Sequence, residues 1–279
     1  MGVGKYKGYS VLMSVYYKEN PAYLKQAITS IQAQTLPADD FVLVCDGALT
    51  PGLDAVIAET KREMGELLNV VRLSENSGLG NALNVGLRHC KNELVARMDS
   101  DDIAYPTRCE KQLTVFNTYL EVSICSGVVE EFTIDPSIVD AKRVPPETNA
   151  QIVEFAKTRN PFNHPCVMYK KSAVEAVGSY QEFYLLEDYY LWLRMLMAGY
   201  QGYNIQEPLL HMRAGIGMYL RRAGWKYAKA QVKLFKFMRR QGFIGIGQYI
   251  KSCVIRSASS LAPNWLRKLV FERVLRDAD

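Results

Sequence analysis

Three carboxylates stand together at Asp99, Asp101 and Asp102, just after the apolar run Leu94–Ala96. Like charges this close repel one another and cost free energy unless a cation joins them. A divalent metal with hard oxygen ligands, which can also hold phosphate oxygens, is the usual solution. A solvated acidic turn is the simpler interpretation, and for an isolated Asp-x-Asp it is the better one. The surrounding elements and motifs must therefore decide between a metal site and a solvated acidic turn.

The first hundred residues alternate between apolar runs and helical spacings. We expect strands at residues 9–17, 41–45, 69–73 and 93–98, and helices at 21–34, 52–64 and 81–90. This alternation predicts parallel βαβ units in an α/β sheet. Ligands bind outside the carboxyl ends of such strands. Tyr16, Asp46 and Asp99 fall at three of these ends, which favours one common site.

The second half has a less regular pattern. We expect strands at 122–132 and 165–169, a loop at 140–147, a helix at 186–199, and two short strands around Pro208 within 203–213. After Gly217 the pattern is wholly helical.

Composition is that of an ordinary globular protein, with 279 residues, 48% hydrophobic and 23% charged. The six cysteines are scattered without a Cys-x-x-Cys pair, which indicates reduced thiols in a cytosolic protein and no zinc site. No uncharged apolar run approaches the roughly 20 residues of a membrane span. Residues 1–9 do not have the pattern of a signal peptide.

The net charge of +5 hides an asymmetry along the chain. From Arg213 onward there are 15 Lys and Arg against 3 Asp and Glu, whereas the preceding residues hold 19 against 26. A stripe of basic residues recurs there at helical spacing, at Arg222, Lys226, Lys229, Lys233, Lys236 and Arg240. A basic amphipathic helix indicates contact with a membrane surface. A solvated helix face packed on the preceding domain is the alternative, and no motif supports nucleic-acid binding.

Six segments in order carry a resemblance to a known family. They are SVYYKENPAYLKQAITSIQAQT, VLVCDG, LSENSGLGNALNVGL, ARMDSDDIAYPTR, NPFNHPCVMYKKSAV and LLEDYYLWLRMLMAGY. From about Val11 to Arg213 the chain resembles the inverting glycosyltransferases of family 2, and within them the bacterial enzymes of capsule, exopolysaccharide and O-antigen synthesis.

The resemblance implies the GT-A fold, a Rossmann-like mixed α/β sheet flanked by helices that binds nucleotide-sugars. We expect a catalytic domain over residues 1–215 and a basic helical region over 216–279.

The resemblance also implies where the nucleotide-sugar binds. Asp46 would accept a hydrogen bond from the base, with Ser14, Val15 and Tyr16 as the wall of the base pocket. Glu19 would lie near the ribose, or is simply an acid favoured at a helix N-terminus. Asn81, after a Gly-containing turn, would contact the nucleotide or only form the start of the helix. Ser100 is also expected to contact the nucleotide-sugar.

For the metal, the resemblance implies Mg²⁺ or Mn²⁺ bridging the two phosphates. Asp101 is the expected direct ligand, and Asp99 binds metal or ribose. The role of Asp102 stays open.

A second acidic pair, Glu187 and Asp188, opens the expected helix at 186–199. In the family the corresponding pair supplies the general base, and we assign that role to Asp188. Acids favoured by a helix N-terminus are the alternative.

Several basic side chains could face the acceptor or the diphosphate. His164 fits either role or a structural one. His211, Arg213, Arg221 and Arg222 lie where related enzymes bring a loop over the diphosphate, and a guanidinium suits phosphate geometry.

Together these features predict an inverting, metal-dependent glycosyltransferase. Its expected donor is a UDP-linked sugar, with GDP- and dTDP-linked sugars as the alternatives. Its expected acceptor is a lipid-linked saccharide at the inner face of the cell membrane. A nucleotidyltransferase is the first rival, but the glycine-rich loop expected after its first strand is missing. A non-catalytic nucleotide-sugar or polysaccharide binding module is the second.

Overall fold

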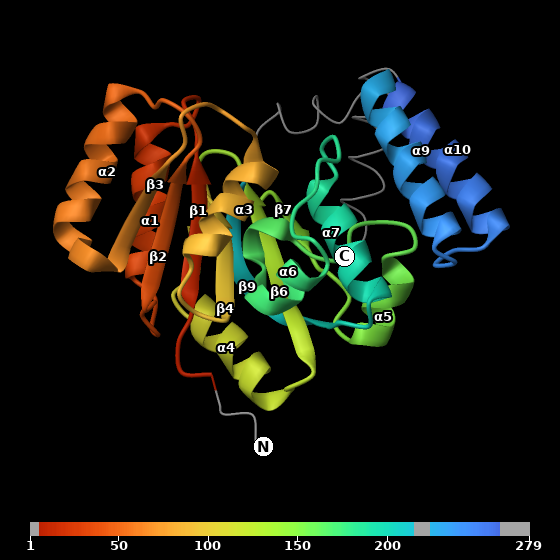
Figure 1. Ribbon diagram of the computed structural model, residues 1–279, viewed down its shortest axis with the longest axis horizontal. Coiled ribbons are helices and arrows are strands. Elements are labelled where there is room, and N and C mark those ends of the chain that lie inside the picture. Colours follow the sequence, from red (N-terminus) through yellow and green to blue (C-terminus); the bar gives the residue numbers. More distant parts are fainter. Residues whose placement is uncertain (1–5, 215–223, 263–279) are drawn as a thin grey trace.

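A mixed sheet covered by helices on both faces forms the body of the molecule, and a helical hairpin lies at one end (Figure 1). The computed structural model describes residues 6–214 and 224–262. The described strands follow the order β3-β2-β1-β4-β8-β6-β9-β5, and β7 pairs with β6 outside this path. The expected mixed α/β sheet is confirmed.

The first half alternates strands and helices as expected. Its elements are β1 (Ser10–Val15), α1 (Pro21–Gln32), β2 (Asp40–Cys45), α2 (Pro51–Met64), β3 (Leu68–Arg72), α3 (Leu79–His89) and β4 (Leu94–Asp99). The four strands are parallel neighbours. Helix α1 begins where the Asn20 side chain accepts a hydrogen bond from the Ala22 N–H and Pro21 occupies the first turn, a favourable start because proline lacks a donor.

The second half adds mainly antiparallel pairs. Its elements are β5 (Ile103–Ala104), α4 (Arg108–Thr118), β6 (Val122–Phe132), β7 (Ala141–Arg143), α5 (Asn149–Phe155), β8 (Met168–Lys170), α6 (Lys171–Ala176), α7 (Glu187–Met197) and β9 (Gln201–Arg213). Strand β8 runs antiparallel to β4 and β6, whereas β9 runs parallel to β6. Short 3₁₀ turns cover Gly65–Leu67 and His164–Cys166.

Three expectations for the second half are wrong. The region around Pro208 is one strand, β9, because its pairing with β6 shifts register near Val128 and accommodates the missing proline N–H. The expected loop at 140–147 contains β7, whose Ala141 pairs with Glu131. The expected strand at 165–169 begins as a 3₁₀ turn through Pro165, and β8 starts only at Met168.

Two apolar clusters lie on opposite faces of the sheet. One joins alternate residues of β1 with α1, α2 and α4, and the other joins the remaining strand residues with α3, α7 and α9 (Trp225–Arg240). Helix α3 approaches the sheet closely at Gly86, where an added Cβ would lie 2.4 Å from Leu12 Cδ1 and 2.6 Å from Val44 Cγ2. Glycine is therefore required there by packing.

The C-terminal hairpin consists of α9 and α10 (Ile246–Leu261). The apolar side of α9 is buried in the cluster that contains Trp192 of α7, and the Tyr190 and Phe237 rings meet edge to face at 4.9 Å. The alternative of a helix packed on the preceding domain therefore holds for this side of α9. Arg222, the first residue of the expected basic stripe, lies outside the described residues. Within 6–214 and 224–262, no helix combines the length and apolar character of a membrane span.

Candidate functional site

The candidate site lies at the carboxyl edge of three neighbouring strands. Ser14 of β1 pairs in register with Asp99 at the end of β4. On the other side, the Asp46 N–H after β2 donates to the Val15 carbonyl at 2.8 Å. The structure thus brings together the strand ends that the sequence pattern placed in one site. Tyr16 follows at this edge, with its ring exposed beside that of Tyr17.

Asp99 is held by a buried cation. Both terminal guanidinium nitrogens of Arg97, two residues earlier on β4, donate to the Asp99 carboxylate. Arg97 is buried, whereas the Asp99 side chain is 36% exposed. A bidentate guanidinium–carboxylate pair fixes the carboxylate plane. Asp99 is therefore an oriented, partly accessible carboxylate.

Asp101 lies near two other carboxylates at this edge of the sheet. Burial raises the pKa of its carboxyl to about 7, and the neighbouring charges of Asp99 and Glu19 add to the rise. Glu19 reaches the same place from the loop after β1, where it accepts a hydrogen bond from the Ser100 hydroxyl at 2.7 Å. The structure therefore groups Glu19, Ser100, Asp99 and Asp101, although they come from two segments of the chain.

Asp102 has a different environment. It is buried, and its Oδ1 accepts a hydrogen bond from the Arg213 backbone N–H at 2.8 Å. Burial, followed by the charges of Asp101 and Asp99, raises the pKa of Asp102 well above its usual range. These contacts give Asp102 a structural role, since it ties the end of β9 to the acidic turn.

The pair Asp99 and Asp101 fits a divalent cation. Carboxylate oxygens are the ligands that Mg²⁺ and Mn²⁺ prefer, and the charges of Asp99 and Glu19 act on Asp101 from nearby. Across the described ranges, no group of three or more His, Cys, Asp or Glu side chains forms a ready-made metal site. Mg²⁺ is typically held by one or two carboxylates together with phosphate oxygens.

Asp46 braces the turn that enters α3. Its two carboxylate oxygens accept from the backbone N–H groups of Ser77 at 2.7 Å and Gly78 at 3.0 Å. Asn81 donates from its side-chain amide to the Ser77 hydroxyl at 2.8 Å. Asp46 and Asn81 thus meet through one turn. Their contacts to a nucleotide stay predictions.

The acidic pair Glu187 and Asp188 opens α7 as expected. Asp188 accepts from the Asn160 side-chain amide and from the Tyr189 N–H, both at 2.7 Å. These bonds orient its carboxylate. Burial raises the pKa of Glu187, and the charge of Asp188 adds to the rise. Glu187 lies beside the start of α3, since a Cβ on Gly80 would come within 3.9 Å of Glu187 Cγ.

Tyr180 connects the two acidic groups. Burial raises its pKa, and among the charges around it those of Asp188 and Asp99 add to the rise while that of Arg97 opposes it. Its hydroxyl lies 2.9 Å from His164 Nε2. Burial lowers the pKa of His164 well below its usual value, and the charge of Arg97 lowers it further. His164 is therefore neutral and belongs to the wall between the acidic groups.

The remaining basic candidates are spread out. The Arg213 guanidinium lies 3.7 Å from the centroid of the Tyr23 ring and donates to the Asp101 carbonyl and the Gln26 side chain. His211 stacks on Tyr105 at 4.4 Å. In the pairing of β5 with β9, His211 lies opposite Ile103, the residue directly after the acidic turn, and its Nδ1 is 3.7 Å from Glu130 Oε2. Arg221 and Arg222 lie outside the described residues.

Two residues of the site were missed from the sequence, namely Arg97 and Tyr180. The signal for Arg97 was present, because a charged residue inside an otherwise apolar buried strand has to be paired. Tyr180 gave no such signal, since it follows a turn far from the other motifs.

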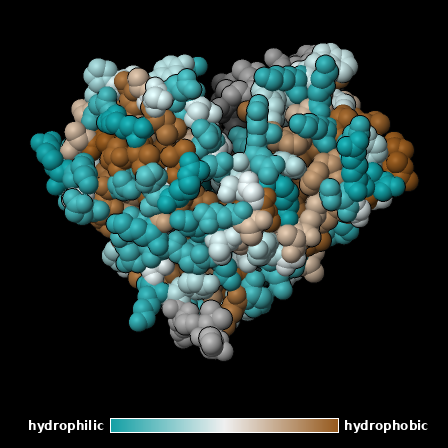
Figure 2. Space-filling view, viewed as in Figure 1, coloured by the Kyte–Doolittle hydropathy of each residue, from teal (hydrophilic) through white to brown (hydrophobic). Residues whose placement is uncertain are grey.

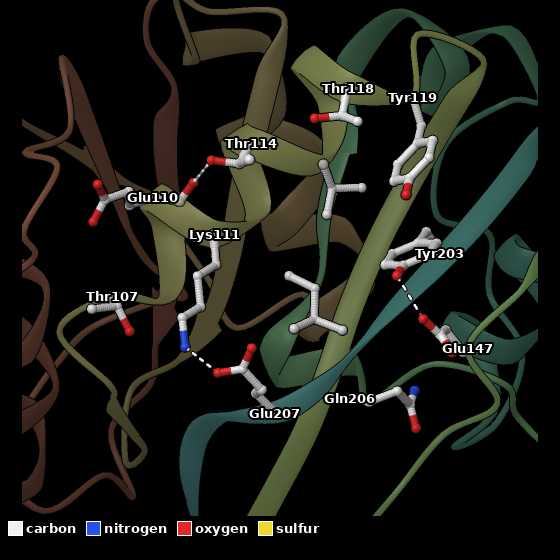
Figure 3. A pocket seen from close by; sticks show the side chains of 12 residues that line it. Thr107, Glu110, Lys111, Thr114, Thr118, Tyr119, Glu147, Tyr203, Gln206 and Glu207 are labelled. Atoms are coloured by element: carbon white, nitrogen blue, oxygen red, sulfur yellow. Dashed lines mark hydrogen bonds and ion pairs between the residues drawn. The ribbon is translucent and has the colours of Figure 1, made fainter.

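A groove of about 630 Å³ lies elsewhere, between α4 and β9 (Figure 3). The Tyr119 and Tyr203 rings stack there at 5.3 Å, and the Tyr203 hydroxyl donates to Glu147 at 2.7 Å. Lys111 pairs with Glu207. None of the predicted site residues lines this groove. A second hollow, next to β5, includes His211.

Comparison with known proteins identifies the family to which the chain belongs. Residues 10–178 match the model of "Glycosyl transferase family 2". The chain belongs to glycosyltransferase family 2. This confirms the resemblance read from the six motifs, and it favours a glycosyltransferase over a nucleotidyltransferase.

Several curated members of the family match nearly the whole chain. An "Uncharacterized glycosyltransferase" of Haemophilus influenzae is 41% identical over 96% of this chain and 99% of its own length. The "Amylovoran biosynthesis glycosyltransferase AmsE" of Erwinia amylovora is 39% identical over 95% and 98%. The "UDP-Gal:alpha-D-GlcNAc-diphosphoundecaprenol beta-1,3-galactosyltransferase" of Escherichia coli is 37% identical over 96% of each chain.

Solved structures share the fold at lower identity. TarS of S. aureus (residues 1–349), in complex with UDP-GlcNAc, has a TM-score of 0.67 at 17% identity and covers 98% of this chain and 76% of its own. The mannosyltransferase PcManGT of Pyrobaculum calidifontis, in complex with GDP-Man and Mn²⁺, has a TM-score of 0.62 at 19% identity, covering 90% and 69%. These likenesses confirm the GT-A type of fold.

Proposed function

We propose that this family 2 glycosyltransferase moves a sugar from a UDP-linked donor to a hydroxyl of a lipid-linked saccharide, with inversion, during synthesis of a bacterial surface polysaccharide. The observation that supports the proposal most is that two carboxylate groups flank one wall, with Asp99 and Asp101 on one side and Glu187 and Asp188 on the other. The charges of Asp99 and Asp188 both raise the pKa of Tyr180, which lies near both groups. Asp99 and Asp101 suit donor binding through a metal ion, and Glu187 and Asp188 suit removal of the acceptor proton.

The choice of donor and acceptor rests on relatives. The Escherichia coli relative is named for UDP-Gal and for a diphosphoundecaprenol-linked acceptor, and the Erwinia relative for amylovoran biosynthesis. Both match over almost their full lengths. We infer a UDP-linked donor and a lipid-diphosphate-linked acceptor from them, with the sugar left open.

In this proposal the residues divide the work. Asp188 takes the proton from the acceptor hydroxyl while that oxygen attacks the anomeric carbon opposite the leaving group, which gives inversion without a covalent enzyme intermediate. Asp99 and Asp101 would hold Mn²⁺ or Mg²⁺, which when bound neutralises charge on the departing diphosphate. Ser14, Val15, Tyr16 and Asp46 would surround the base, and Glu19 the ribose.

Contact with the base and with the diphosphate would also involve groups that are already hydrogen-bonded in this structure. An ionised carboxylate has about four lone-pair sites, so Asp46 can accept from a base N–H while it holds the turn at Ser77 and Gly78. Arg213 uses two of its five N–H donors on Asp101 and Gln26, so it can keep both contacts while it donates to the diphosphate. Asn81 is exposed at the start of α3 and needs no such change.

A thermal-shift series tests the donor part of the proposal. Ligands that bind the native state raise the melting temperature by mass action. We expect UDP and UDP-sugars to raise it only with Mn²⁺ or Mg²⁺, and Asp101→Asn to abolish the metal-dependent part. Gln248→Glu, far from the site on α10, is the control for a change of one charge. No shift with any nucleotide, or an equal shift in Asp101→Asn, would contradict the proposal.

A further inference from the structure

Helix α10 carries an apolar stripe on its outer side. Ile246, Ile250 and Val254 are 58%, 55% and 63% exposed, and their spacing of four residues places them on one side of the helix. Leu261 continues the stripe, because a step of seven residues is two helical turns. An exposed row of this length is unusual on a surface helix.

The opposite side of α10 is already used in packing. Ser252 and Ser260 are buried, and the Arg256 guanidinium donates to the Thr158 carbonyl at 2.6 Å. The Gly224 N–H donates to the Ser260 carbonyl at 2.9 Å, which brings Trp225, 69% exposed, next to the end of α10. The helix is therefore fixed with its apolar stripe facing outward and an aromatic ring beside it.

The neighbouring helix α9 presents cations. Its apolar residues pack inward, whereas Lys229, Lys233, Lys236, Arg239 and Arg240 are exposed. In the part of the chain that the structure describes, none of these five forms an ion pair. Figure 2 shows the hydrophobic side chains gathered at the outer edge of the hairpin, with hydrophilic ones alongside. The hairpin thus exposes an apolar strip and a cationic strip side by side.

We propose that this outer side of the α9–α10 hairpin docks on an anionic lipid bilayer. The stripe Ile246, Ile250 and Val254 enters the boundary between head groups and acyl chains, and the α9 cations contact lipid phosphates. Amphipathic helices with one apolar side and Lys- or Arg-rich flanks bind membranes in this way, and cations close to an anionic lipid surface are attracted to it. Trp225 suits the interface, where amphipathic rings concentrate.

The exposed positive charge of α9 favours an anionic lipid surface over a protein partner. Lysine is depleted in protein–protein interfaces, whereas here lysines adjoin the apolar stripe. A second copy of the chain would bring two cationic strips together. This inference rests on the proposed function only in that a lipid-linked acceptor gives the docking a purpose, and vesicle binding can be measured without turnover.

Vesicle flotation of the full chain tests the inference. We expect binding to vesicles of phosphatidylcholine with one quarter phosphatidylglycerol, weaker binding to phosphatidylcholine alone, and loss of binding at high salt. Ile250→Glu should reduce binding at least tenfold, and Ile250→Glu with Val254→Glu should abolish it. Leu120→Glu replaces an exposed leucine at the end of α4 and should bind like the wild type.

Other results would overturn the inference. These are no vesicle binding by the wild type, equal binding by Ile250→Glu, or a concentration-dependent dimer that Ile250→Glu disrupts in the absence of vesicle binding. The metal-dependent thermal shift with UDP should be unchanged in Ile250→Glu. Absence of vesicle binding by the wild type, with its metal-dependent shift intact, would contradict the docking surface alone, whereas absence of the shift in the wild type would contradict the proposed function.

Discussion

At the scale of single residues, Arg97 organises the site. It is a buried cation whose only side-chain hydrogen bonds go to Asp99, within the described chain. A buried ion pair is weak evidence for stability, because desolvation offsets the attraction. Its better-supported effect is orientation, since the two contacts from Arg97 fix the Asp99 carboxylate next to Asp101.

A double-mutant cycle measures this coupling. In Arg97→Lys the charge stays but the two-pronged contact is lost, and in Asp99→Asn the charge of the partner is lost. Because the residues touch, we expect a coupling energy between about 0.5 and 3 kcal/mol from chemical denaturation. Asp54→Asn removes a carboxylate that pairs with Arg72 at the surface and serves as the control. Additive effects of Arg97→Lys and Asp99→Asn would contradict the coupling.

His164 makes stability depend on pH. Its pKa is lowered in the folded protein, so below the unfolded value of about 6.5 the unfolded chain binds a proton that the folded chain does not. The contribution of His164 to the free energy of unfolding should therefore fall as pH drops below 6.5, by at most about 1.4 kcal/mol per pH unit. The raised pKa values of the Asp101 and Asp102 carboxyls act in the opposite direction, because these groups gain protons first in the folded chain.

His164→Gln, which can still bond to Tyr180, should remove this part of the pH dependence. Urea denaturation at several pH values between 5 and 7.5 checks it. His89→Gln changes an exposed histidine on α3 and should retain the wild-type slope. An unchanged slope in His164→Gln would show that other groups cause the acid sensitivity.

At the scale of elements, apolar periodicity located the four parallel strands and the helices between them to within a few residues. It failed where tertiary contacts decide. Strand β7 lies in a segment with Pro145 and Pro146 nearby, and forms because β6 offers a free edge. Helix α4 was not expected, since its buried side includes Arg108 and Gln112, which donate to the backbone carbonyls of Arg97 in β4 and Cys125 in β6. Buried polar side chains of this kind disguise a helical pattern.

The contact between α3 and the sheet gives a prediction at this scale. Gly86→Ala places a Cβ against Leu12 and Val44, and overpacking of this kind costs about 1–3 kcal/mol. Gly247→Ala in α10, where nothing lies within 4 Å of the added Cβ, should instead stabilise by about 0.4–1 kcal/mol. Thermal and urea denaturation of both variants give the comparison. Equal effects would mean that helix propensity, not packing, decides at Gly86.

At the scale of the whole molecule, the sequence predicted which strand ends converge but not how their side chains are used. Asp99, Asp101, Glu19 and Ser100 do meet. Asp102, whose role was open, ties down β9 instead. Sequence spacing cannot show this, because the partner, the N–H of Arg213, is 111 residues away.

The structure also shows which sides of the basic C-terminal helices are exposed. The sequence predicted membrane contact through the basic C-terminal helices, without showing which helix sides are exposed. In the structure, the apolar side of α9 is buried against α7, and the exposed apolar residues belong to α10. A helical pattern does not reveal which of its sides another element covers. The division into a catalytic domain and a separate helical region therefore stays a prediction.

The most direct test of the proposed inverting transfer is an assay with UDP-sugars as donors and a lipid-diphosphate-linked saccharide as acceptor. The anomeric configuration of the product is determined by NMR. The account predicts inversion, dependence on a divalent cation, and a fall of about 10²–10⁴-fold in kcat for Asp188→Asn, with metal-dependent donor binding preserved and a smaller loss for Glu187→Gln. Retention of configuration, or undiminished transfer by Asp188→Asn, would contradict it.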